Sequence, residues 1–285
     1  MPAEIKNSAT SDLSPVPTGK LVVHALPAGE PRVVFSLVVP TRNESRNLKE
    51  LIERLKPAIS AEAGDSYEII VVDDNSPDLT WQIAARLAVA DPHVVALRRE
   101  NERGLATAVV RGWQAARGEW LGVIDADLQH PPEVTTRLLT AMRDGADLAV
   151  ASREAEGGST SDWSLLRLLI SRSSRALGNL LLPGVLNKVS DPMTGFFVMR
   201  RTAMEGVLLD PCGYKILVEL LGRARLQKIA EVGYVFRSRQ RGESKASMKV
   251  FADYVQHLLR LRTSVTGAAF NAEPKPPKPI ASGQH

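Results

Sequence analysis

Apolar runs alternate with amphipathic stretches through the first half of the chain. Short β-branched runs predict strands at residues 33–40, 67–74, 93–99, 120–127 and 147–153. Apolar residues at helical spacing predict helices at 45–59 and 79–90, and a further helix that opens at Gly104. Continuous apolar strands separated by helices are typical of a mostly parallel sheet with both faces covered, so we expect an α/β fold.

The two ends of the chain lack this alternation. Residues 1–31 are rich in Ser, Pro and Thr, and we expect them to form a flexible leader. The Pro- and Lys-rich stretch at the other end predicts a disordered tail over residues 263–285. One folded domain remains at residues 32–262, which is long enough to bury most of its surface.

Composition and charge narrow the function classes. The chain is 44% hydrophobic and 24% charged, as an ordinary globular protein is, and its net charge of +4 does not favour a nucleic-acid binder. Residues 237–262 nevertheless hold seven basic and two acidic residues, a local excess that suits a phosphate-bearing ligand or an anionic membrane. Cys212 is the only cysteine, so no intrachain disulfide can form and a reducing compartment is expected. No apolar run reaches the about 18 residues that a membrane span needs.

Three predicted strands end in polar clusters: PTRNE at residues 40–44, DDNSPD at 73–78 and DADLQ at 125–129. Ligands of parallel sheets bind beyond the carboxyl ends of the strands, so we expect one site built from these three loops. Asp125 and Asp127 would point to the same side of an extended strand. Together with the amide oxygen of Gln129 they suit Mg²⁺ or Mn²⁺, which also bind diphosphate oxygens. The alternative is that both carboxylates are merely solvated at a strand end.

The other two clusters allow more than one interpretation. Asp73 either contacts a base or ribose or caps the next helix, and for Asp78 capping is favoured. Glu44 lies near a helix start, where its charge would favour the helix dipole. The stretch RGLATAVVRG, residues 103–112, lacks the GxGxxG spacing of a dinucleotide-binding loop.

Seven motifs together resemble one family. PTRNE, VVDDNSPD, RGLATAVVRG, DADLQHPP, ASR, DPMTGFF and RQRGESK occur in the order found in dolichol-phosphate (polyprenol-phosphate) mannose synthases. These are family 2 glycosyltransferases with a GT-A fold, and the resemblance covers about residues 33–262. It implies a GT-A catalytic domain, GDP-mannose as donor and a polyprenyl (dolichyl-type) phosphate as acceptor.

The resemblance also implies roles for individual residues. The nucleotide pocket would be lined by Pro40, Arg42, Glu44, Val71 and Asp73. Metal and diphosphate would be held by Asp125, Ala126, Asp127 and Gln129. Phosphates of donor or acceptor would be met by Arg153, Arg239 and Lys245, and the lipid phosphate also by Arg167. The acceptor loop would comprise Asp191 and residues 194–197. Asp127, Arg153 and Arg167 are the expected catalytic residues, and Arg42 replaces the family's usual Tyr, so it either stacks on the base or is an exposed loop charge.

A polyprenyl phosphate oxygen is already ionised near neutral pH, so we expect a direct displacement that needs no strong general base. The developing charge on the leaving diphosphate would be stabilised by a divalent metal and cationic side chains. One displacement inverts the anomeric centre, and the product would be a polyprenyl β-mannosyl phosphate. The alternative activity is glucose transfer from UDP-glucose. A phosphoacceptor receiver domain fits poorly on length and on the position of its acids, and a non-catalytic scaffold is disfavoured by the complete set of motif residues.

A lipid acceptor requires contact with a membrane. Residues 161–182 and 246–262 are basic and amphipathic, and each predicts either a membrane-interface helix or an ordinary core-facing helix. With a lipid substrate implied, we expect interface binding at the cytoplasmic face of a membrane. The chain resembles the short members of the family, and we expect a membrane-anchoring protein as a partner.

Overall fold

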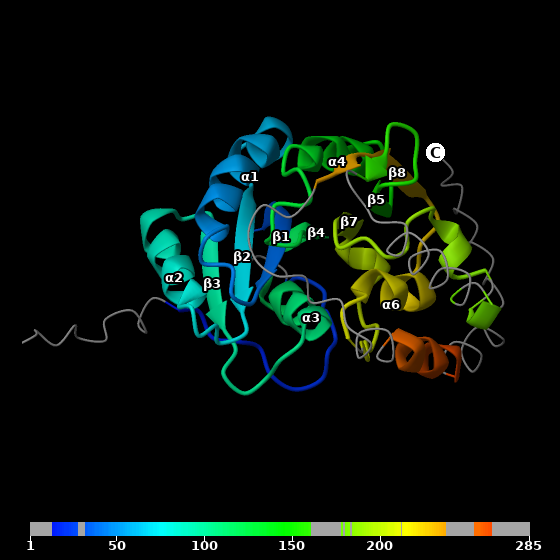
Figure 1. Cartoon of the computed structure of the whole chain (residues 1–285), viewed down its shortest axis with the longest axis horizontal. Helices are drawn as coiled ribbons and strands as arrows, with labels where there is room; N and C mark the ends of the chain where they lie inside the picture. Colours follow the sequence, from blue (N-terminus) through cyan, green and yellow to red (C-terminus); the bar gives the residue numbers. More distant parts are fainter. Residues whose placement is uncertain are drawn as a thin grey trace, which may run out of the picture.

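The protein is represented by a computed structural model that describes residues 13–27, 32–160, 178, 180–182, 184–211, 213–237 and 254–263. Its centre is a seven-stranded sheet with the strand order β3-β2-β1-β4-β7-β5-β8 (Figure 1). The strands are β1 (Val33–Thr41), β2 (Tyr67–Asp73), β3 (Val94–Arg98), β4 (Gly118–Val123), β5 (Leu148–Ser152), β7 (Phe197–Arg200) and β8 (Ile229–Gly233). Only β7 runs antiparallel to its neighbours within this sheet, so the predicted mostly parallel sheet is confirmed.

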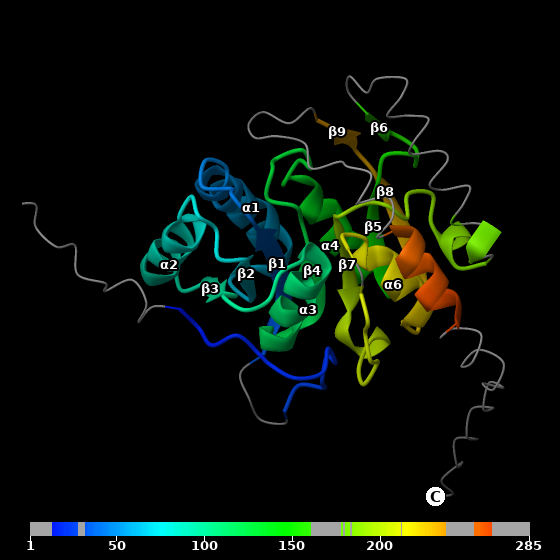
Figure 2. The same ribbon diagram turned by 60° about the horizontal axis from the view of Figure 1, so that its bottom comes forward.

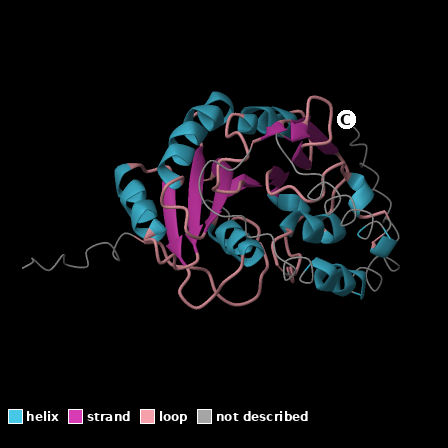
Figure 3. Cartoon of the chain, viewed as in Figure 1, coloured by secondary structure: helices cyan, strands magenta, loops and turns pink. Residues whose placement is uncertain are grey.

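Helices cover both faces of this sheet (Figures 1 and 3). One face carries α1 (Leu48–Ala63), α2 (Thr80–Ala90) and α4 (Val134–Arg143). The other carries α3 (Leu105–Ala115), α6 (Ile216–Arg223) and a helix at residues 254–263. The remaining elements are the short parallel pair β6 (Ser159–Thr160) and β9 (Val235–Phe236), and the 3-10 turns η2 (Leu186–Lys188) and η3 (Arg201–Ala203).

The period-two alternation of a strand divides the core into two layers. In β1, Leu37 and Val39 belong to the layer under α1 and α4, whereas Val38 belongs to the layer under α3 and α6. All three side chains are fully buried. The continuous apolar runs of the sequence therefore reflect strands that are covered on both faces.

The strand predicted at residues 120–127 is shorter in the structure, because β4 ends at Val123. Its ladder with β1 closes where the N–H of Ile124 donates to the carbonyl oxygen of Val38, 3.1 Å away. In this register the next donor on β1 would be Pro40, which has no N–H. Asp125 and Asp127 therefore lie in a turn that includes Leu128 at φ 60°, and the expectation that they share one side of an extended strand is wrong.

The N-terminal segment differs from the flexible leader expected over residues 1–31. Its described part, residues 13–27, passes below α3 as the blue strap in Figure 2, and Val23 is fully buried in the core. Bridges pair Val22 with Leu208 and Val23 with Glu205. The side chain of Gln114 on α3 donates to the carbonyl oxygen of Val22 at 3.0 Å, so side chains of the domain satisfy the backbone of this segment.

The helix at residues 254–263 covers most of the segment 246–262, for which the sequence predicts either a membrane-interface helix or a core-facing helix. Its apolar side packs on α6: Leu258 and Leu261 are fully buried, and Nε2 of His257 lies 2.8 Å from Oε2 of Glu219. For these residues the core-facing alternative is therefore the one observed, because the apolar side is already covered by the domain. Residues 161–177 and 246–253 lie outside the described part of the chain. Within the part that is described, every helix is too short or too polar to cross a bilayer.

Candidate active site

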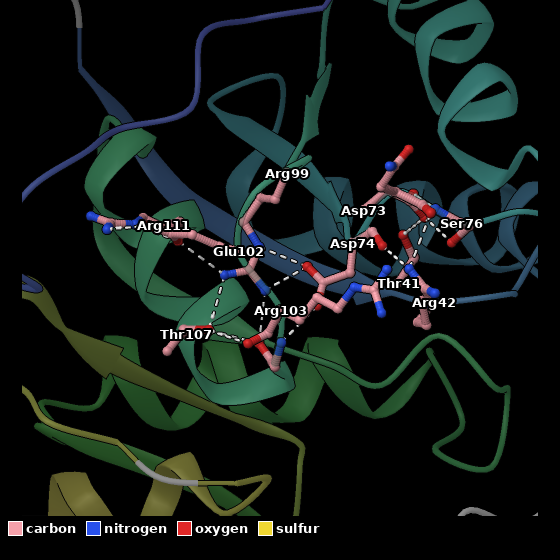
Figure 4. Close-up of polar contacts among 12 residues, drawn as sticks. Thr41, Arg42, Asp73, Asp74, Ser76, Arg99, Glu102, Arg103, Thr107 and Arg111 are labelled. Carbon is pink, nitrogen blue, oxygen red and sulfur yellow. Dashed lines mark hydrogen bonds and ion pairs between the residues drawn. The ribbon is translucent and has the colours of Figure 1, made fainter.

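The loops after β1 and β2 meet at the carboxyl edge of the sheet, as the polar clusters predict (Figure 4). The Arg42 guanidinium, at the end of β1, donates to the carbonyl oxygens of Asp74 and Asn75, the second at 3.0 Å. The backbone N–H of Asn43 donates to Oγ of Ser76 at 2.9 Å. Arg42 is thus only partly exposed, and its guanidinium ties the two loops together.

Asp73 stabilises the loop after β2 through hydrogen bonds to its buried carboxylate. Its carboxylate accepts hydrogen bonds from Oγ1 of Thr41 at 2.8 Å and from the backbone N–H and Oγ of Ser76, each at 2.7 Å. Burial raises the pKa of Asp73, while the hydrogen bonds from Ser76 and Thr41 act in the opposite direction. The side chain is fully buried, so it closes the turn and presents no surface to a ligand in this conformation.

A buried ion-pair network beside this loop was missed by the sequence analysis (Figure 4). Nε of Arg99 donates to Oδ1 of Asp74 at 2.7 Å, and the backbone N–H of Gly104 donates to Oδ2 of Asp74 at 2.8 Å. Arg99 is 2% exposed and also donates to the carbonyl oxygen of Gly104 at 2.8 Å. Asp74 therefore neutralises the N-terminus of α3, the place where a dinucleotide-binding loop would hold phosphate. The sequence indicates this network only through the two adjacent acids of VVDDNSPD and the arginine that follows β3.

The acid pair lies in the next loop, after β4. The side chain of Asp125 is 32% exposed, yet its Oδ1 is buried and has no hydrogen-bond partner in the part of the chain described. Asp127 is largely buried, and its Oδ1 accepts from the backbone N–H of Gln129 at 3.1 Å. The Gln129 amide nitrogen donates to the carbonyl oxygen of Arg237 at 3.1 Å, and Ala126 between the two acids is buried.

These residues fit a divalent cation. An unpartnered, buried carboxylate oxygen is costly unless a cation or donor satisfies it. Among the residues described, no three or more His, Cys, Asp or Glu side chains are grouped so that they could hold a metal ion. Two carboxylates and one amide are hard oxygen donors that suit Mg²⁺ or Mn²⁺, with the remaining positions left to water and diphosphate.

The predicted acceptor loop lies beside the acid pair. A Cβ built on Gly195 would lie 2.5 Å from Oδ2 of Asp125, so only glycine allows this close approach. In the same loop Asp191 accepts two hydrogen bonds from Arg153, from Nε at 2.6 Å and from Nη2 at 2.7 Å. Burial opposes both charges, yet the pairing raises the pKa of Arg153 and lowers that of Asp191. The guanidinium is therefore held charged and in one orientation by the loop whose Gly195 approaches Asp125.

The remaining predicted residues fall into two groups. Pro40 and Val71 are buried within the sheet, and Glu44 precedes α1, where its Oε2 accepts from Nδ2 of Asn47 at 2.7 Å. Arg167, Arg239 and Lys245 lie outside the described residues.

Comparisons with known proteins agree with this fold. The sequence profile of Glycosyl transferase family 2 matches residues 36–208, and the chain belongs to that family. The chain is 44% identical over 226 residues to a dolichol-phosphate mannosyltransferase of Pyrococcus furiosus, and the match covers 79% of this chain and 63% of the relative. It is 37% identical over 245 residues to the dolichol-phosphate mannosyltransferase of Saccharomyces cerevisiae, covering 83% of this chain and 90% of the relative. The chain thus spans slightly under two thirds of the Pyrococcus protein and most of the yeast protein.

The fold also occurs in solved structures. One is glucosyl-3-phosphoglycerate synthase from Mycobacterium tuberculosis, in complex with Mn²⁺, UDP and glucosyl-3-phosphoglycerate. The TM-score is 0.61 at 20% identity, and the match covers 82% of this chain and 80% of the other. This likeness confirms the GT-A type of α/β fold.

Proposed function

We propose that the chain is an inverting, metal-dependent glycosyltransferase that moves mannose from GDP-mannose to a polyprenyl phosphate and forms a polyprenyl β-mannosyl phosphate. The observation that carries this proposal is the match to two proteins named dolichol-phosphate mannosyltransferase, at 44% and 37% identity over most of this chain. The acid pair with its unpartnered oxygen supports a metal-dependent reaction.

Each described group has a role in this reaction. Asp125, Asp127 and Gln129 would hold Mg²⁺ or Mn²⁺, which when bound neutralises charge on the donor diphosphate. Arg153, oriented by Asp191, would meet a phosphate of donor or acceptor. The lipid phosphate oxygen is ionised near neutral pH, so no side chain is needed as a strong base.

The nucleotide would lie across the loops after β1 and β2. Arg42 holds these loops together through the carbonyl oxygens of Asp74 and Asn75 and would face the base. The buried groups of Pro40, Val71 and Asp73 would shape the pocket from behind, and Glu44 would border it. Arg167, Arg239 and Lys245 would supply further phosphate contacts, as the resemblance to the family implies.

The lipid acceptor places this reaction at a membrane surface. We propose peripheral binding at a cytoplasmic face, with residues 161–182 as the interface segment and a membrane-anchoring protein as partner. Flotation of the protein with anionic vesicles tests this binding. If the protein alone does not float with the vesicles, residues 161–182 do not bind the membrane by themselves and the partner protein must recruit the enzyme.

Transfer of labelled sugar from GDP-mannose and, separately, from UDP-glucose to a polyprenyl phosphate tests the proposal, with Mg²⁺ or Mn²⁺ and with chelator. Mannose transfer that needs metal is the expected result. Glucose transfer alone would overturn the donor and keep the site, whereas no transfer from either donor with lipid and metal present would favour a non-catalytic relative.

A further inference from the structure

A buried aromatic pair lies directly behind the acid pair. His130 is 3% and Tyr234 2% exposed, and Nδ1 of His130 lies 2.8 Å from the Tyr234 hydroxyl. The other ring nitrogen, Nε2, lies 3.5 Å from Oδ2 of Asp125. The rings of Phe196 and Phe236 enclose the imidazole at centroid distances of 5.6 and 5.1 Å. A polar chain of three residues therefore ends on one of the two expected metal-binding carboxylates.

The contacts define the order of this chain. A carboxylate can only accept a hydrogen bond, so Nε2 of His130 is the donor side of the ring toward Asp125. Nδ1, on the other side of the ring, contacts the Tyr234 hydroxyl. Burial raises the pKa of Tyr234 far above its ordinary value, so this hydroxyl keeps its proton. The contact with Tyr234 and the two phenylalanine rings thereby fix the plane of the His130 ring.

The two oxygens of Asp125 have different surroundings. Oδ2 lies 3.5 Å from Nε2 of His130, whereas Gly195 approaches both oxygens. Oδ1 is buried without a hydrogen-bond partner in the described part of the chain. His130 thus contacts one oxygen of the carboxylate, and the second oxygen lacks the partner that a bound cation would supply.

We propose that Tyr234 and His130 are positioning residues that hold Oδ2 of Asp125 so that Oδ1 faces a divalent cation. This inference rests on the proposed function, because it takes Asp125 and Asp127 as the cation site. Hydrogen-bonded groups behind a metal-binding carboxylate fix its orientation, and their removal weakens metal affinity about 10- to 100-fold.

Binding of Mn²⁺ to the full-length protein, measured without donor by the electron paramagnetic resonance of free Mn²⁺, tests the inference independently of turnover. His130→Asn keeps a polar atom near the Nδ1 position but does not reach Asp125, and we expect about tenfold weaker Mn²⁺ binding. His130→Gln places its amide N–H near the Nε2 position, so its affinity should stay within about threefold of wild type. Tyr234→Phe removes a single hydroxyl and should weaken binding several-fold while the fold, checked by circular dichroism, is kept.

The chain offers a matched control at the opposite end of β2. There Tyr67 stacks on His93 at 4.4 Å between ring centroids, and Nδ1 of His93 lies 3.1 Å from Oδ1 of Asp91. Tyr67→Phe and His93→Asn change the same residue types and should leave Mn²⁺ affinity at the wild-type value.

The outcomes separate the two claims. Weaker binding in His130→Asn and Tyr234→Phe, with recovery in His130→Gln, supports positioning. Wild-type affinity in His130→Asn and Tyr234→Phe, together with loss of binding in Asp125→Asn, would overturn the positioning role and keep the cation site. Wild-type affinity in Asp125→Asn would instead overturn the cation site itself.

Discussion

Replacement of Gly195 by alanine would place a methyl carbon 2.5 Å from Oδ2 and 2.9 Å from Oδ1 of Asp125. An ordinary carbon–oxygen contact is about 3.3 Å, so the carboxylate must retreat by roughly 0.8 Å. The carboxylate is the end of a flexible side chain, and its displacement should cost only about 1 kcal/mol of stability. Mg²⁺ requires oxygen ligands in a narrow distance range, so the same shift should remove Asp125 as a ligand and lower transfer about 100-fold.

The assay pairs the rate of sugar transfer at saturating metal with the melting temperature. Gly145→Ala is the control, because Gly145 lies in the turn after α4 at φ 94° and only Nζ of Lys228, at 3.9 Å, lies near a built Cβ. Alanine is strained at this φ, so this variant should lose about 1 kcal/mol of stability, roughly 2–4 °C, at a wild-type transfer rate. Wild-type activity in Gly195→Ala, or a loss of stability larger than in the control, would refute the reasoning, since the backbone rather than the carboxylate would then have moved.

Arg99→Ala leaves Asp74 buried without its ion-pair partner and should lower the free energy of unfolding by about 3–5 kcal/mol in urea; a change well below 1 kcal/mol would contradict this. Pairing with Arg153 outweighs burial and lowers the pKa of Asp191 in the folded protein. The ion pair therefore contributes its full stabilisation above the ordinary aspartate pKa of about 3.9, and this stabilisation is lost as pH falls through the lowered pKa of the folded state. The difference in melting temperature between wild type and Asp191→Asn should therefore shrink as pH falls below about 4, and a constant difference would argue against the ion pair. Arg42→Ala should weaken GDP binding about tenfold by calorimetry, through loss of hydrogen bonds from a charged donor, and unchanged affinity would remove Arg42 from the nucleotide pocket.

The sheet and its three polar loops were predictable because their signals are local. Each apolar run marks a strand that is covered on both faces, and each polar cluster marks the end of such a strand. The strand after Gly118 was predicted too long because its end depends on Pro40, which lies on the neighbouring strand. The acid pair was therefore found in the right loop but with the wrong local geometry.

Other features depend on partners that are distant in sequence. The His130–Tyr234 contact joins residues 104 positions apart, and no spacing rule could connect them. The buried side of the helix at residues 254–263 faces α6, although its sequence fits a membrane interface equally well. Val23 lies in the short apolar run LVVHAL, residues 21–26, and is buried in a hydrophobic layer of the domain; the run is too short to stand out within the Ser-, Pro- and Thr-rich segment.

The most direct test measures transfer of labelled mannose from GDP-mannose to polyprenyl phosphate. Wild type and Asp127→Ala are compared, each with Mn²⁺ and with chelator, to determine whether the acid pair serves a metal-dependent mannosyl transfer. We expect a mannosylated lipid only from wild type with metal, while both proteins give the same circular dichroism spectrum. A wild-type rate in Asp127→Ala, or transfer by wild type that chelator leaves unchanged, would contradict this account of the site.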